Sequence, residues 1–284
     1  MSFVTANGIK LAYDTRGDGP AVLLAAPAGA DRKVWRYQVP VLAAAGYRVI
    51  TFNHRGIAPS AEPGAVTLTD LIGDTACLIE ALGAAPCGIV GVSLGAFIAQ
   101  ELAATSPQLV AAAVLMGTKA RQDVFREALG RAQAALGAVH GALEPEVRAV
   151  LTALQYLSPA TLGNDVDMPA WLYMFGQQPA AATAHAGIDC AAGGAARLAN
   201  VTCPCLVMGF GDDLIAPPHL CREVAEAIPD GRYLELAGCG HLGYLEQPGL
   251  VSKHITDFFA ATFPPGRAAP GGQARREAGQ QDRP

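Results

Sequence analysis

The chain has 284 residues, of which 51% are hydrophobic and 16% charged, and its formal net charge is −5. A chain of this length is expected to fold as one large domain, and its sparse, net negative charge excludes the basic footprint of a nucleic-acid-binding protein. No segment reaches about 18 consecutive apolar residues, and the N-terminus lacks the basic and apolar regions of a secretory signal. We therefore expect a cytoplasmic protein, monomeric or homodimeric, that acts on a small molecule and binds neither nucleic acid nor a membrane.

The cysteines favour free thiols over disulfides or metal ligands. There are seven of them, an odd number, and they are scattered along a chain without a secretory signal. Cys203-Pro204-Cys205 lacks the two-residue spacer of zinc and redox motifs. We expect mostly buried free thiols, no bound metal and no cofactor.

Strand and helix signals alternate along the first 117 residues. Asn7-Gly8, between two short strand-like segments, predicts an antiparallel hairpin at the start. Apolar runs then alternate with apolar residues at helical spacing, which predicts strands at 22–26, 48–52, 88–91 and 110–116 and helices at 35–45, 68–82 and 94–105. Buried strands separated by helices indicate a mostly parallel, twisted β-sheet with helices on both faces, an α/β fold.

From residue 118 to residue 198 the text becomes Ala-rich and helical, and the alternation then resumes with strands at 205–210 and 232–238 and helices at 220–228 and 249–259. A helical block between two strands of one sheet predicts an inserted cap. The final segment is rich in Pro, Gly, Ala and Gln, which predicts a disordered tail. The predicted organisation is a core α/β domain in two parts (1–117 and 199–263), a helical cap (118–198) and a tail (264–284).

The strongest chemical motif is the pentapeptide Gly91-Val92-Ser93-Leu94-Gly95, which matches G-x-S-x-G. A strand ends and a helix begins here, so the chain must turn sharply at Ser93. The small flanking residues let the strand and helix pack closely, and the helix N-terminus favours developing negative charge. These features predict a nucleophilic serine; the alternative is a plain glycine-rich turn.

A serine hydroxyl is a poor nucleophile at neutral pH unless a base adjoins it. His241 is the candidate base, because it lies in a glycine-flanked loop between the last strand and the last helix. The imidazole in turn needs an acid to fix its tautomer. Asp213 follows directly on the strand at 205–210 and is our choice, with the adjacent Asp212 as the alternative.

The order Ser93, Asp213, His241 is the order expected in an α/β hydrolase, and the chain resembles that fold family along most of residues 1–263. The segment "QVPVLAAAGYRVITFNHRGIAPSA" resembles the family's stretch from the first helix to the Arg-Gly loop, with Asn53 where Asp is more common, and "HLGYLEQP" is a typical family ending. The resemblance implies a serine-dependent, lid-containing member of the family.

The family also implies an oxyanion hole formed by two backbone N–H groups. One belongs to the residue after the nucleophile, here Leu94. The other lies in the loop after the strand at 22–26, which usually begins His-Gly but here reads Ala26-Pro27-Ala28-Gly29. Counting back from Trp35 places Ala28 at the donor position; a register shifted by one would place Pro27 there, which has no N–H.

Aromatic residues in the predicted cap are candidates for an apolar binding pocket over Ser93; they are Phe125, Tyr156, Trp171, Tyr173 and Phe175. Packing of the cap onto the core is the alternative role for these side chains.

The leading hypothesis is a serine hydrolase that acts on an ester, lactone or thioester of a small, largely apolar substrate through an acyl-enzyme on Ser93. One alternative keeps the fold but changes the reaction to C–C cleavage, acyl transfer to an acceptor other than water, cyclisation or isomerisation, as the altered loop at 26–28 suggests. The other alternative is a non-catalytic ligand-binding member of the fold.

Overall fold

A computed structural model describes residues 1–61, 64–140, 143–177, 185, 188 and 194–266, with side chains described up to residue 136 in the second of these ranges. Its centre is an eight-stranded sheet in the order β1-β2-β4-β3-β5-β6-β7-β8. The strands are β1 (Ser2–Ala6), β2 (Ile9–Arg16), β3 (Ala21–Ala25), β4 (Arg48–Phe52), β5 (Cys87–Val92), β6 (Val110–Met116), β7 (Cys205–Phe210) and β8 (Gly231–Leu236).

β1 and β2 form the predicted antiparallel hairpin, and the turn between them has positive φ at Asn7 and Gly8. β2 also pairs antiparallel with β4, whereas β3 to β8 pair parallel to one another. The predicted α/β class with a mostly parallel sheet is confirmed.

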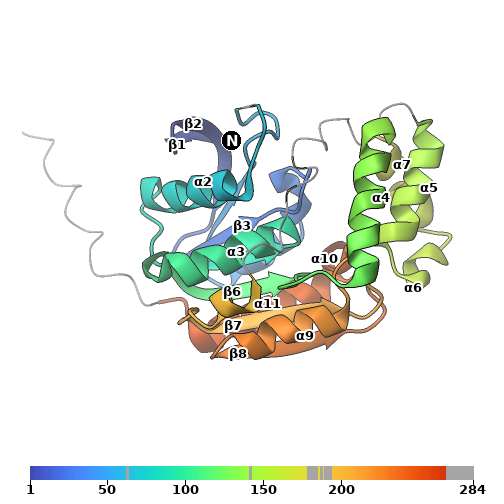
Figure 1. Cartoon of the computed structure of the whole chain (residues 1–284). Helices are drawn as coiled ribbons and strands as arrows, with labels where there is room; N and C mark the ends of the chain where they lie inside the picture. Colours follow the sequence, from blue (N-terminus) through green and yellow to red (C-terminus); the bar gives the residue numbers. More distant parts are fainter. Residues whose placement is uncertain (62–63, 141–142, 178–184, 186–187, 189–193, 267–284) are drawn as a thin grey trace, which may run out of the picture.

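Helices cover both faces of the sheet (Figure 1). The helices of the core are α1 (Gln38–Ala44), α2 (Leu68–Ala81), α3 (Leu94–Thr105), α9 (Pro218–Ala227), α10 (Gly243–Glu246) and α11 (Pro248–Thr262). Side chains of α2, α3 and α9 share one hydrophobic cluster, and those of α1 and α11 share the other. Within β3, Leu23 belongs to the first cluster and Val22 and Leu24 to the second, because successive side chains of a strand point to opposite faces.

The helix predicted at 35–45 starts later than expected, whereas the helix predicted at 68–82 starts at the predicted residue. The chain forms a 3₁₀ turn, η1 (Arg32–Trp35), before α1 begins at Gln38, so the predicted helix from residue 35 starts later. α2 is capped by Thr67, whose side chain accepts from the Asp70 N–H while the Asp70 carboxylate accepts from the Thr67 N–H. This reciprocal capping box places the start of α2 at Leu68.

Helices also fill the segment between β6 and β7. They are α4 (Val124–His140), α5 (Pro145–Tyr156), α6 (Pro159–Leu162), α7 (Met168–Gly176) and α8 (Gly194–Leu198). α4 to α7, called the inserted helices below, form a group beside one end of the sheet (Figure 1). Of the predicted tail, residues 267–284 lie outside the described residues.

None of the described helices has both the length and the apolar character needed to cross a membrane. The described residues also contain no group of three or more His, Cys, Asp or Glu side chains arranged to hold a metal ion.

Candidate active site

Ser93 occupies a strained turn between β5 and α3. Its φ of 53° and ψ of −119° lie in a region that L-residues seldom adopt. The turn depends on its two flanking glycines: a Cβ on Gly91 would lie 2.2 Å from the Gly95 carbonyl oxygen, and a Cβ on Gly95 would lie 2.0 Å from the Ala25 carbonyl oxygen. The start of α3 can therefore lie in backbone contact with both β5 and β3 only with glycine at both positions, as in a nucleophile elbow.

Asp213 and His241 form a buried hydrogen-bonded pair. Asp213 Oδ2 lies 2.7 Å from His241 Nδ1, and the two residues are 2% and 3% exposed. Asp213 Oδ1 accepts two further hydrogen bonds, from the N–H groups of Ile215 at 2.7 Å and Ala216 at 2.9 Å. Both oxygens of the carboxylate are thus occupied, and the imidazole is held with Nδ1 toward the acid.

The neighbouring Asp212 has a different environment. Its side chain is exposed, and its backbone N–H donates to the Cys239 carbonyl oxygen at 2.8 Å. Of the two candidate acids, the structure brings Asp213 to the imidazole.

Burial and hydrogen bonding act on Asp213 in opposite directions. Burial, the largest single influence, raises the pKa of the carboxyl, but the positive charge available on His241 and the three hydrogen bonds together lower it below its ordinary value of 3.8. The carboxylate is therefore ionised at neutral pH although it is buried.

The end of β6 connects the Asp213–His241 pair to Ser93. The Ser93 N–H donates to the Met116 carbonyl oxygen at 2.9 Å, which continues the parallel pairing of β5 with β6. The next residue, Gly117, lies directly against the pair: a Cβ there would be 3.2 Å from His241 Cε1 and 3.4 Å from Asp213 Oδ2. Ser93 and the pair thus adjoin consecutive residues, Met116 and Gly117, at the carboxyl end of β6. Among the described residues, the Ser93 hydroxyl forms no hydrogen bond with His241 or with any other residue.

The two predicted oxyanion donors lie on segments that meet beside Ser93. Leu94 is the first residue of α3, and the first amides of that helix to bond internally are those of Ala96 and Phe97, which donate to the Ser93 carbonyl oxygen. The close approach of Gly95 to Ala25 brings the end of β3 against this helix start. Ala28 follows in the loop after β3 and is exposed. Its role as a donor stays a prediction.

A family model described as the α/β hydrolase fold matches residues 20–248. The chain belongs to the α/β-hydrolase fold family. The resemblance drawn from the elbow and the downstream loops is therefore confirmed.

Relatives of this α/β hydrolase match it along most of its length. A Mycobacterium tuberculosis protein named "Putative non-heme bromoperoxidase BpoC" is 43% identical over 258 residues, which cover 89% of this chain and 98% of that protein. Its crystal structure, from strain H37Rv, matches with a TM-score of 0.83 and 41% identity over 89% of this chain and 96% of that one. A thermophilic esterase from Thermogutta terrifontis matches with a TM-score of 0.78 and 26% identity over 92% of this chain and 98% of that one.

Of the five aromatic residues predicted to bind substrate, Tyr156 is brought to the pair. Its ring centroid lies 5.6 Å from that of His241, and its carbonyl oxygen accepts from the Leu242 N–H at 3.2 Å. Burial, with a smaller contribution from the charge of Asp213, raises the pKa of the Tyr156 phenol. The phenol is therefore neutral beside the imidazole of this α/β hydrolase.

The other four aromatic residues lie elsewhere. Phe175 is 1% exposed and packs against Trp171 inside the α5–α7 pair, with ring centroids 5.7 Å apart. Trp171 also lines a cavity of about 370 Å³ that includes none of Ser93, Asp213 and His241 among its lining residues. Tyr173 and Phe125 are 71% and 59% exposed. For Phe175 the packing role is the one the structure supports.

Two further histidines, His54 and His185, contact the loop after β3. His54 Nε2 lies 3.1 Å from the Ala26 carbonyl oxygen, so it carries the proton of that hydrogen bond. His185 Nδ1 accepts from the Gly29 N–H at 3.3 Å, while its Nε2 lies 2.8 Å from the Arg55 carbonyl oxygen. The loop that lacks the family's own histidine is thus held by two histidines from other segments. His54 follows the carboxyl end of a predicted strand, which was a usable signal; His185 had none.

Glu246 was also missed, and it joins the His241 loop to the inserted helices. Its Oε2 accepts from the Gly240 N–H at 2.6 Å, and its Oε1 accepts from both the N–H and the hydroxyl of Ser158 at 2.8 Å. The neighbouring Cys239 is buried, and burial raises the pKa of its thiol to about 12. A thiol that stays protonated at neutral pH is a poor nucleophile.

Proposed function

We propose that this α/β hydrolase is a serine hydrolase acting on an ester, lactone or thioester of a small, largely apolar substrate. The observation that carries the proposal is the buried Asp213–His241 pair beside the end of β6. The strained Ser93 turn is hydrogen-bonded to the same strand end, through the Met116 carbonyl. Tyr156, packed against His241, supplies an apolar wall.

The mechanism uses the free nitrogen of the imidazole. Because Asp213 accepts a hydrogen bond from His241 Nδ1, the proton of the neutral ring sits there and Nε2 carries the lone pair. Nε2 takes the proton of the Ser93 hydroxyl as Oγ attacks the acyl carbon. The tetrahedral intermediate collapses when the imidazolium returns that proton to the departing alkoxide or thiolate.

Water completes the cycle. His241 removes a proton from a water molecule that attacks the acyl-enzyme, and the proton passes to Ser93 Oγ as the acid is released. The N–H groups of Leu94 and Ala28 are the proposed donors to the oxyanion in both halves of the reaction, each worth about 10²–10³ in kcat.

The test combines covalent labelling with turnover. A fluorophosphonate probe should add one adduct to the protein, located on Ser93 by peptide mass spectrometry, and a series of p-nitrophenyl esters should be hydrolysed with a preference for apolar acyl groups. Ser93→Ala should abolish both signals. Intact labelling of that variant would show that another residue is the nucleophile.

The name of the M. tuberculosis relative supports a second candidate, bromide oxidation with hydrogen peroxide. Bromination of an organic acceptor in the presence of peroxide and bromide, measured for the wild type and for Ser93→Ala, distinguishes the two. Ester hydrolysis without bromination favours the first candidate, and bromination without ester hydrolysis favours the second.

A further inference from the structure

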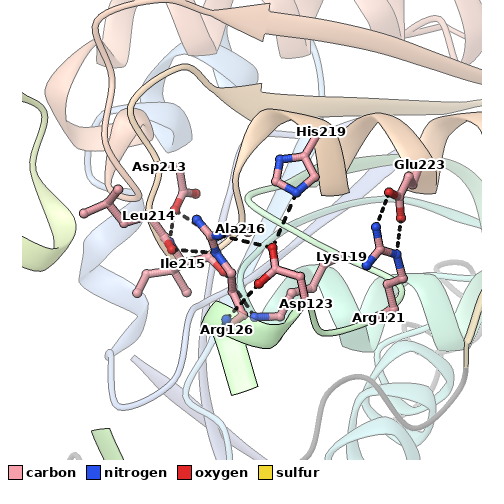
Figure 2. Close-up of polar contacts among 10 residues, drawn as sticks. All are labelled: Lys119, Arg121, Asp123, Arg126, Asp213, Leu214, Ile215, Ala216, His219 and Glu223. Atoms are coloured by element: carbon pink, nitrogen blue, oxygen red, sulfur yellow. Dashed lines mark hydrogen bonds and ion pairs between the residues drawn. The ribbon is translucent and has the colours of Figure 1, made fainter. Parts of the chain in front are cut away.

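The backbone that follows Asp213 supplies two of the three hydrogen bonds to its carboxylate. Asp213 Oδ1 accepts from the N–H of Ile215 and from the N–H of Ala216 (Figure 2). Each N–H belongs to a peptide group whose carbonyl is that of the preceding residue, Leu214 or Ile215. In a trans peptide the N–H and the C=O point in opposite directions, so the two carbonyls point away from the carboxylate.

Each of these two carbonyl oxygens accepts a hydrogen bond from a positively charged side chain. Arg126 Nε donates to the Leu214 carbonyl oxygen at 3.1 Å, and Lys119 Nζ donates to the Ile215 carbonyl oxygen at 3.2 Å (Figure 2). Both cations lie in the segment that leads from β6 into α4, and Arg126 is in the first turn of that helix. The two chains of contacts run from a positive side chain through one peptide group to the same carboxylate oxygen.

This arrangement has a direct electrostatic consequence. A positive charge on a carbonyl oxygen draws electron density through the amide and makes its N–H a stronger donor, as hydrogen bonds in a chain polarise one another. It also fixes the direction in which that N–H points. We propose that Arg126 and Lys119 are positioning residues for Asp213, which hold and polarise the two peptide groups that bind its Oδ1. The proposal rests on the proposed function, in which Asp213 orients His241.

Arg126 is itself held in place. Asp123 accepts from the Arg126 backbone N–H at 2.8 Å and from its Nη1 at 3.1 Å, and the two side chains are 14% and 23% exposed. The hydrogen bond from the Arg126 backbone, followed by the charge of Arg126, lowers the pKa of Asp123, so this carboxylate stays ionised. His219 Nε2 lies 3.5 Å from the same carboxylate. The guanidinium therefore reaches the Leu214 carbonyl from a fixed base at the root of the inserted helices.

Arg121 offers a matched control, because it also lies in the segment that leads from β6 into α4 and also contacts the part of the chain that follows β7. Arg121 makes a two-pronged ion pair with Glu223 of α9, at 2.8 and 2.6 Å, without touching the peptide groups bound to Asp213 (Figure 2). Arg121→Met removes an arginine from this contact. It leaves intact the hydrogen bonds that link Arg126 and Lys119, through the two peptide groups, to Asp213. Arg126→Met and Lys119→Met each remove one cation from a carbonyl.

The experiment compares these variants with the wild type by ester turnover and by proton NMR of the His241 Nδ1–H, assigned by its loss in His241→Ala. We expect Arg126→Met and Lys119→Met each to lower kcat by about tenfold with KM within about twofold, the pattern of a misplaced catalytic group rather than of lost substrate binding. The Nδ1–H resonance should move and exchange faster with water. Arg126→Lys should recover part of kcat, and Arg121→Met should match the wild type in both measurements.

The acid limb of the pH profile of kcat/KM is a second readout. Its position should not change if Arg126 and Lys119 have a purely structural role. With weaker N–H donors, the Asp213 carboxylate interacts more strongly with the imidazolium and stabilises its protonated form. The acid limb should therefore shift to higher pH in Arg126→Met and not in Arg121→Met. The charged and titratable groups around Asp213 and its loop enter this profile, and they include Lys119, Asp123, Arg126, Tyr156, Asp212, His219, Cys221 and His241. The comparison with Arg121→Met keeps all of these groups in place.

The outcomes separate this inference from the proposed function. Arg126→Met and Lys119→Met that equal Arg121→Met in kcat, pH profile and Nδ1–H resonance overturn the positioning role. Failure of the wild type to hydrolyse any ester overturns the proposed function, while the resonance still reports on the pair. If one of the two variants does not fold, the other carries the same test on the second peptide group.

Discussion

Gly117 offers a sharp test of the site, because Gly83 has the same φ angle and no atom within 4 Å of the position that its Cβ would occupy. Gly117 and Gly83 both have φ of +55°, and a left-handed conformation costs an alanine about 1–2 kcal/mol at either position. A Cβ on Gly83 would meet no atom within 4 Å, whereas a Cβ on Gly117 would lie 3.2 Å from His241 Cε1, 3.3 Å from His241 Nδ1 and 3.4 Å from Asp213 Oδ2. The two alanine variants therefore share a backbone cost and differ in what the methyl group touches.

The expected displacement follows from these contacts. Carbon atoms prefer separations of about 3.5–4.0 Å, so the imidazole in Gly117→Ala must retreat by about 0.3–0.8 Å. A misplacement of about 1 Å at a catalytic group costs about 10²-fold in rate. We expect Gly117→Ala to lower kcat for ester hydrolysis by about tenfold with KM nearly unchanged, and Gly83→Ala to leave both constants at their wild-type values.

The assay measures kcat and KM on one p-nitrophenyl ester and the free energy of unfolding by urea titration. Both variants should lose about 1–2 kcal/mol of stability, so any difference in kcat comes from the site. Equal kcat for the two variants would refute the placement of His241 against the end of β6.

Other variants test the neighbouring groups. Asp213→Asn should lower kcat by about 10⁴-fold because an amide permits the wrong imidazole tautomer, while Asp212→Asn should have little effect in the same kinetic assay. The pKa of His54 is lowered to about 3, first by burial and then by His185, so the stability from its neutral form is complete above pH 6.5 and is lost as the pH falls toward 3. Urea titrations across that range should show a slope of about 1.4 kcal/mol per pH unit that His54→Asn removes. The Glu246 carboxylate accepts from two N–H groups and one hydroxyl, and Glu246→Gln would place an amide NH2, itself a donor, against one of these donors. The variant should lower both kcat and the thermal midpoint. Unchanged values would contradict the role of this carboxylate in joining the two segments.

Local patterns in the sequence were sufficient for the fold class and for the order of the site residues. Strands buried on both faces read as continuous apolar runs, and three of them, Arg48–Phe52, Val110–Met116 and Cys205–Phe210, are observed with the predicted bounds. The turn at Ser93 was visible because a strand, a glycine-flanked serine and a helix follow one another within a few residues.

The tertiary structure decided what local patterns leave open. Asp212 and Asp213 are adjacent and chemically identical, and only the course of the loop after β7 turns Asp213 inward to His241. His185 meets Gly29 across 156 residues of chain, a distance that no periodicity or spacing in the sequence reports. The same is true of Arg126 and the Leu214 carbonyl, 88 residues apart. The sequence by itself thus determined the elements and the chemistry that each can supply, whereas the contacts between distant segments came from packing, because backbone groups such as these carbonyls leave no mark in the amino-acid sequence.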